Sequence, residues 1–151
     1  MTQQAKSLLT DQMKRAVGVE WEPTVLDVER GHVRRFAEAI GDSNPLFIDE
    51  KRARKSCHGG LIAPPTFLRA VLAPQPKVDL KLPQRVLDGG SDWEYFGPVR
   101  VGDVITARAK IASIAERTLS LGPALFVTTE ISYVNQFGEV VATQRSTRIC
   151  Y

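Results

Sequence analysis

The chain has 151 residues, of which 43% are hydrophobic and 25% charged, and its formal net charge at pH 7 is +3. This length predicts one folded domain that can bury an apolar core without disulfides or a structural metal. No apolar run approaches the length of a membrane helix, and the basic residues form no long block, so neither a membrane nor a nucleic-acid partner is predicted. The mildly basic balance suits an anionic ligand.

The first residues, MTQQAKSLL, lack the long apolar core of a secretory signal peptide, which predicts a cytoplasmic protein. The chain holds only two cysteines, Cys57 and Cys150, and this number suits a reducing compartment rather than a disulfide framework. The neighbours Cys57 and His58 do not match the ligand spacing of a structural zinc site. We therefore predict no metal and no cofactor.

The first forty residues predict one strand and one amphipathic helix. Residues 1–19 are polar and read as an N-terminal extension with at most a short helix, and residues 20–28 predict a strand with a break at Pro23. A helix is predicted over 29–40, because apolar residues recur there at helical spacing, namely Val33, Phe36, Ala37 and Ile40. Gly41 is the expected helix stop.

Two further helices and a loop are expected before the second half of the chain. Residues 49–56 predict a short helix with a basic outer face, and the apolar run 66–72 predicts a helix buried against a sheet. Phe67 and Leu68 are the expected core residues of that buried helix. Residues 73–83 hold three prolines and two lysines, which predicts an exposed loop.

The second half of the chain predicts about four consecutive antiparallel strands. Apolar and polar residues alternate along the clearest of them, and the Gly89-Gly90 pair predicts a bulge or a close backbone approach in the first. The expected strands are 86–96, 104–114, 125–134 and 140–149, with a hairpin turn at 135–138. Strand, helices and then antiparallel strands is an α+β order, in which a helix packs on one face of a curved sheet.

One stretch, IGDSNPLFIDEKRARKSCHGGLIAPPTF over residues 40–67, concentrates residues that packing alone does not require. Asn44-Pro45 interrupts helical structure, Gly59-Gly60 permits a tight backbone path, and Pro64-Pro65 starts the next helix. A loop that delivers polar groups to the start of a helix is a suitable place for chemistry on a carbonyl group.

This stretch resembles the signature of the MaoC-like, R-specific enoyl-CoA hydratases and 3-hydroxyacyl dehydratases. The resemblance extends over residues 19–149 and rests on three motifs together: Gly-Asp-x-Asn-Pro, a Gly-Gly pair before a helix, and Pro-x-x-x-Gly-Asp before a strand. It implies a single hot-dog domain over residues 1–151, with an antiparallel sheet wrapped around a central helix. It also implies water addition to an enoyl thioester, or the reverse elimination.

The resemblance fails at two positions that carry the chemistry. Catalytic members have an aspartate, here Asp42, and a histidine five residues later, where this chain has Phe47. Phenylalanine cannot move a proton. Catalytic members also tend to have His-Gly where this chain has Pro64-Pro65, and proline has no N–H to bind a thioester oxygen, unless Thr66 replaces it.

These departures resemble the N-terminal half of double hot-dog enzymes, or the matching small subunit of heteromeric dehydratases. The implied role is to bind an acyl-CoA or acyl-carrier thioester and to pair with a second hot-dog subunit, either another copy or a different chain. The substrate-binding residues expected on this basis are Asn44, Phe47, Gly59, Gly60, Pro65, Thr66 and Arg100.

Several alternatives stay open from the sequence. Asp42 is either a catalytic acid or a turn residue, and His58 is either a replacement base or an ordinary loop histidine. The basic run 51–55 and Arg100 either contact the phosphates of CoA or an acidic carrier protein, or they are simply exposed to solvent. The aromatic residues within 93–96 either line a ligand tunnel or pack in the core or in a dimer interface. A self-sufficient homodimeric hydratase and a non-enzymatic acyl-CoA-binding module are the alternative functions.

Overall fold

The computed structural model describes residues 7–71, 74–76 and 79–151. Its centre is one five-stranded antiparallel sheet with the strand order β1-β3-β4-β5-β2. The strands are β1 (Thr24–Asp27), β2 (Val86–Tyr95), β3 (Val104–Leu119), β4 (Gly122–Val134) and β5 (Val140–Cys150). The expected run of four antiparallel strands in the second half of the chain is confirmed.

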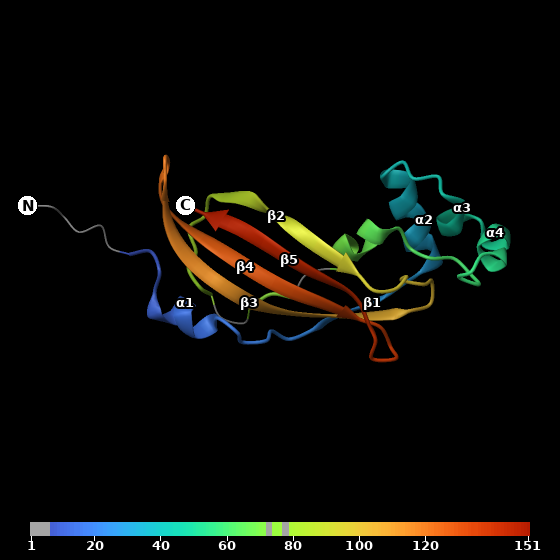
Figure 1. The fold of residues 1–151 in the computed structure, drawn as a ribbon, viewed down its shortest axis with the longest axis horizontal. Helices are drawn as coiled ribbons and strands as arrows, with labels where there is room; N and C mark the ends of the chain where they lie inside the picture. The colour runs from blue at the N-terminus through green and yellow to red at the C-terminus, as the bar shows by residue number, and fades with distance from the viewer. Residues whose placement is uncertain (1–6, 72–73, 77–78) are drawn as a thin grey trace, which may run out of the picture.

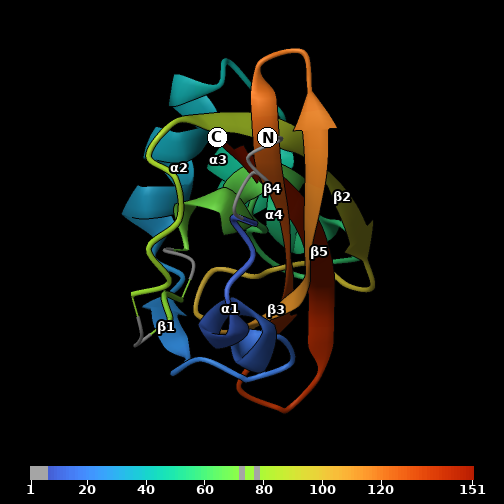
Figure 2. The ribbon, with the colours of Figure 1, turned by 90° about the vertical axis from the view of Figure 1, so that its left-hand side faces the viewer.

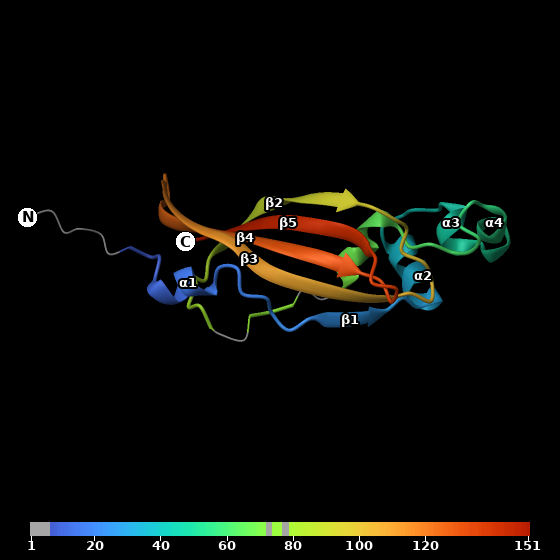
Figure 3. The ribbon, with the colours of Figure 1, turned by 60° about the horizontal axis from the view of Figure 1, so that its bottom comes forward.

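Helical segments cluster at one end of this sheet (Figure 1). They are α2 (Arg30–Ala39), α3 (Pro45–Ile48) and α4 (Glu50–Lys55), while α1 (Asp11–Ala16) lies toward the other end (Figures 1 and 3). A short 3-10 helix, η1 (Pro65–Ala70), lies on the side of the sheet that also faces α2 (Figure 2). This is the predicted hot-dog arrangement. None of the described helices is long and apolar enough to cross a membrane.

The central helix is shorter and tighter than the sequence predicts. The run expected as a helix over 66–72 is the six-residue 3-10 helix η1, and Val71 is already extended. Pro74 follows closely, and because proline cannot donate a backbone hydrogen bond, it disfavours a longer helix. Phe67 and Leu68 are nevertheless buried as expected. Leu72 lies outside the described residues.

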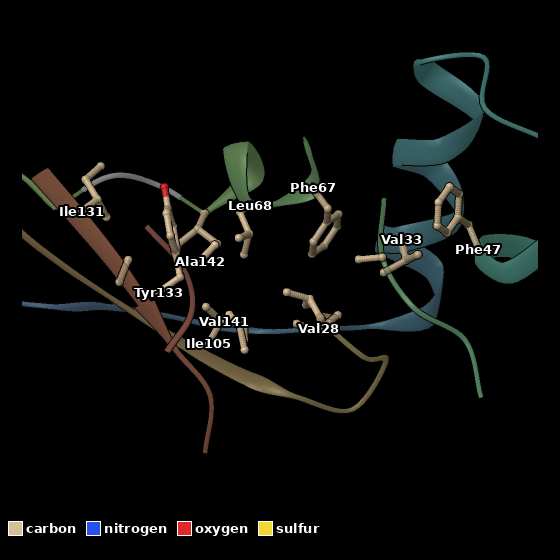
Figure 4. Packing of buried hydrophobic residues seen from close by; sticks show 14 of the residues in the cluster. Val28, Val33, Phe47, Phe67, Leu68, Ile105, Ile131, Tyr133, Val141 and Ala142 are labelled. Carbon is tan, nitrogen blue, oxygen red and sulfur yellow. The ribbon is translucent and has the colours of Figure 1, made fainter. Parts of the chain in front are cut away.

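The apolar core divides into two clusters along the inner face of the sheet. The first surrounds η1 and includes Phe67, Leu68, Ile105 and Tyr133 (Figure 4). The second lies toward α1 and consists of Met13, Leu80, Ile111, Leu125, Val127 and Cys150. Leu80 and Pro74 are buried, so the prediction of an exposed loop over 73–83 is wrong at these two positions, where the segment covers the sheet.

The alternation predicted for the longest strand is confirmed. Ile105, Ala107, Ala109 and Ile111 are all buried on the inner face, whereas Arg108 is exposed on the other. The strand is also longer than expected. Paired with β4, it continues to Leu119 as a ribbon beyond the core.

The predicted irregularity at Gly89-Gly90 is a register shift in the pairing of β2 with β5, between Asp88 and Ser91. Gly90 has a positive φ of 103°, which side chains other than hydrogen rarely tolerate. A Cβ atom on Gly89 would lie only 2.8 Å from the carbonyl oxygen of Thr147. Both glycines are therefore required by backbone geometry.

We expect Gly89→Ala to lower the free energy of unfolding by about 1–3 kcal/mol, because the added methyl group collides with the backbone of β5. Gly97→Ala is the matched control, since no atom lies within 4 Å of its added Cβ and its φ is ordinary. Urea unfolding of both variants measures the difference. Equal stability of the two would contradict the close approach at Gly89.

Candidate functional site

The loop that resembles the hydratase signature begins where α2 ends. Gly41 adopts a positive φ of 71°, and the backbone N–H of Asp42 donates to the carbonyl of Ala37 at 2.9 Å. The carboxylate of Asp42 accepts a hydrogen bond from the N–H of Asn44 at 3.0 Å. Asp42 is half-buried, and this contact is a local turn of the type that Asp commonly forms.

Asn44 starts the helix α3, which the sequence reading did not predict. Its side-chain oxygen accepts from the N–H of Leu46 at 3.0 Å, and Pro45 occupies the first helical turn. Asparagine at the N-cap followed by proline is a recognised helix start, so the signal was present in the sequence. The interpretation that Asn44-Pro45 interrupts the preceding helix is consistent with this geometry.

At the position where the resemblance expects a catalytic histidine, Phe47 lies in the apolar core. Its side chain is only 5% exposed and belongs to the cluster around η1. Figure 4 shows its ring beside Val33 of α2. The side chain at this position therefore contributes packing rather than a proton acceptor.

His58 lines a separate hollow of about 500 Å³, together with Glu50, Arg54, Gly59, Gly60, Leu61, Arg100 and Val101. The backbone N–H of His58 donates to the Ser56 hydroxyl at 3.2 Å, and its backbone carbonyl accepts from the guanidinium of Arg100. Asp42 does not line this hollow. The structure thus places His58, Gly59, Gly60 and Arg100 together, but it gives Asp42 a different setting.

The segment before η1 is held by strand-like pairing with residues 99–101. The N–H of Ala63 donates to the carbonyl of Val99 at 2.8 Å, and that of Val101 donates to Leu61 at 3.0 Å. Pro65 and Thr66 then begin η1 and are both exposed. Because prolines occupy positions 64 and 65, the first N–H available at this helix start belongs to Thr66.

Part of the basic surface of α4 is neutralised by its own helix. Arg54 lies 2.9 Å from a carboxylate oxygen of Glu50, and Arg52 lies 3.5 Å from Asp49. Exposed pairs of this kind contribute little to stability, and they reduce the net charge that a phosphate would meet. Lys51 and Lys55 are exposed on the same helix.

A polar group that the sequence reading missed lies on the inner face of the sheet. The Tyr133 hydroxyl donates to the Gln144 side-chain oxygen at 2.9 Å, and the Gln144 amide donates to the Ser91 hydroxyl at 2.7 Å. The Trp93 ring stacks on the rings of both Tyr133 and Tyr95. The predicted aromatic run is thus partly packed against the sheet, and Phe96 is exposed.

Comparison with known proteins identifies the family of this chain. The family model for the FAS1-like, dehydratase domain region matches residues 15–144. A UPF0336 protein of Parafrankia sp. (strain EAN1pec) is 36% identical over 125 residues, which cover 76% of this chain and 78% of that protein. A probable enoyl-CoA hydratase alpha subunit of Thermomonospora curvata is 32% identical over 132 residues, covering 75% of this chain and 41% of that longer protein.

Solved structures give the same result. The MaoC-like dehydratase from Rhodospirillum rubrum superposes with a TM-score of 0.70 at 27% identity, covering 90% of this chain and 92% of that chain. The C-terminally truncated HadBC (3R-hydroxyacyl-ACP dehydratase) complex from Mycobacterium tuberculosis gives 0.72 at 27% identity, with coverages of 89% and 96%. The chain therefore belongs to the FAS1-like dehydratase region family, within the MaoC-like hot-dog hydratases and dehydratases.

Proposed function

We propose that this chain is the substrate-binding subunit of a hot-dog hydratase or dehydratase, and that it pairs with a hot-dog partner that supplies the acid–base chemistry. The single observation that carries the proposal is the burial of Phe47 in the core, at the position where catalytic relatives have a histidine. General acid–base help contributes roughly 100- to 10,000-fold to such reactions. A subunit that lacks an acid–base residue therefore needs a partner subunit to supply one.

The remaining parts of the signature support the same role. The Asp42 carboxylate accepts a backbone hydrogen bond within its own turn, and the half-buried His58 lines another hollow. Pro64 and Pro65 cannot donate to a thioester oxygen, and a missing donor of this kind costs roughly 100- to 1,000-fold in rate. The loop has the Gly-Asp-x-Asn-Pro motif but lacks two of the groups that the resemblance assigns to catalysis.

The partner surface that we propose is the edge strand β2. It lies at one end of the strand order and has ten residues, whereas the opposite edge β1 has four. An unpaired strand edge offers a row of backbone hydrogen-bonding groups to another chain. Large apolar side chains are also exposed along this edge, namely Val86, Leu87 and Tyr95. A long edge with exposed apolar residues is suited to pairing with a second sheet.

The substrate that we propose is an acyl thioester carried by CoA or by an acyl carrier protein. The Thermomonospora curvata relative is described as the alpha subunit of a probable enoyl-CoA hydratase, and the HadBC structure is a complex of a 3R-hydroxyacyl-ACP dehydratase. The exposed cations Lys51, Lys55 and Arg100 offer attraction to phosphates of either carrier. A cytoplasmic location stays a prediction, with which the free, exposed Cys57 thiol is compatible.

We expect the purified chain to bind crotonyl-CoA without hydrating it, because Phe47 cannot activate water. The measurement is the loss of the enoyl-thioester absorbance, with binding followed by calorimetry. Asp42→Ala is the control variant. Robust turnover by the chain alone that disappears in Asp42→Ala would instead indicate a self-sufficient hydratase, and retained binding without turnover in any complex would indicate a binding module.

We expect the tagged chain, expressed in its native host, to retain a second hot-dog protein that carries the Gly-Asp-x-Asn-Pro-x-His pattern. Leu87→Lys should reduce the retained amount at least about tenfold, because it places a charge beside the proposed pairing edge. Val25→Lys on the other edge strand is the matched control and should retain the partner. Mass spectrometry of the retained proteins identifies the partner and quantifies it for each variant. Equal retention by both variants would rule out β2 as the pairing edge.

A further inference from the structure

The inner face of the sheet is apolar at both ends and polar in the middle. The cluster around η1 covers one end, and the cluster that contains Met13 covers the other. Between them the inward positions of β4 and β5 carry Thr129 and Gln144, which are 8% and 6% exposed. Ser146 pairs directly with Thr129 on the same face. Buried polar side chains in this position need a reason, because apolar residues would pack there without desolvation cost.

The hydrogen bonds from Tyr133 to Gln144 and from Gln144 to Ser91 hold the Gln144 side chain in a fixed orientation. Burial raises the pKa of the Tyr133 phenol to about 12, and the positive charge of Arg69 opposes part of that rise. The phenol therefore stays neutral at physiological pH and keeps its proton for hydrogen bonding. Figure 4 shows the Tyr133 oxygen at the Ile131 end of the cluster, away from Phe47.

A hollow of about 280 Å³ opens beside this polar group. It exists where η1 ends early, with Val71 and Pro74 among its walls. Its polar lining consists of Arg69, Gln75, Thr129, Tyr133, Gln144, Ser146 and Arg148. Among the described residues, no carboxylate oxygen lies within 4 Å of the Arg69 or Arg148 guanidinium. Two cations thus flank a small, hydroxyl-lined hollow.

We propose that this hollow binds a carboxylate at the far end of a short acyl group, so that the substrate class is ω-carboxyacyl thioesters. The inference rests on the proposed function, since it assumes that the chain binds an acyl thioester. Guanidinium groups bind carboxylates through paired, charge-assisted hydrogen bonds, which are stronger than neutral ones. The Thr129 and Ser146 hydroxyls can satisfy the remaining oxygen lone pairs.

The dimensions and polarity of the hollow disfavour a long apolar chain. Its volume is at the lower end of that of small-molecule sites, which suits a group of a few carbons. An alkyl end placed here would cover the Thr129 hydroxyl without offering it a hydrogen bond, and buried polar groups without partners are costly. A short acyl group that ends in a carboxylate fits the small volume and also offers hydrogen bonds to the polar lining.

The test compares two thioesters of equal chain length, glutaryl-CoA and pentanoyl-CoA, by calorimetric titration of the full chain. We expect glutaryl-CoA to bind roughly 10- to 100-fold more tightly, the range of one or two charge-assisted hydrogen bonds. Arg148→Met and Arg69→Met should each remove at least about tenfold of that preference, measured as the ratio of the two dissociation constants in the same variant. Arg145→Met is the matched control, because Arg145 lies on the opposite face of β5, paired with Glu130.

The outcomes separate this inference from the proposed function. Binding of pentanoyl-CoA as tightly as glutaryl-CoA would overturn the carboxylate site and leave the thioester-binding role intact. A preference for glutaryl-CoA that Arg145→Met reduces as much as Arg148→Met would also overturn it, since general attraction of charge would then explain the result. Failure of both thioesters to bind would refute the proposed function together with this inference.

Discussion

The buried carboxylate of Asp103 organises the end of the molecule where the family signature lies. Asp103 is 7% exposed, and its two oxygens accept from the Arg100 N–H at 2.8 Å and the Gln136 amide at 2.9 Å. These bonds fix the turn over 98–103, and that turn pairs with Val28 on one side and with the 61–63 segment on the other. The hydrogen-bonded Asp103 carboxylate, through this turn, therefore positions three segments: the start of η1, the candidate loop and the first strand.

At the position where the resemblance places the catalytic histidine, the side chain of this chain belongs to the hydrophobic core. Burying a phenylalanine stabilises the fold by about 1.5–3 kcal/mol, whereas a catalytic histidine must stay accessible to water and substrate. The buried ring of Phe47 therefore stabilises the fold and supplies no acid–base group at this site. The chain has the features that the proposed binding role requires, namely a curved sheet, a long edge in β2 and a hollow beside η1.

The sequence predicts the strands, the bulge and the family well, because these depend on short-range patterns. Alternation in β3 and the Gly89-Gly90 pair are local signals. The early end of η1 and the burial of Leu80 depend on how a proline-rich loop packs over a distant sheet, so composition alone misleads. The Tyr133–Gln144 bond joins residues on two strands, although a glutamine at an inward position of β5 was a usable signal. The extent of a single domain over residues 1–151 stays a prediction.

The measurement that tests the central claim most directly is hydration of crotonyl-CoA by Phe47→His, with thermal unfolding recorded on the same sample. This variant restores the residue type of catalytic relatives at the position now buried in the core. We expect a lower melting temperature and no gain in turnover at temperatures where the variant is folded, because the side chain faces Val33 rather than a substrate. A folded variant that gains hydratase activity would contradict the claim, since position 47 would then belong to an accessible active site.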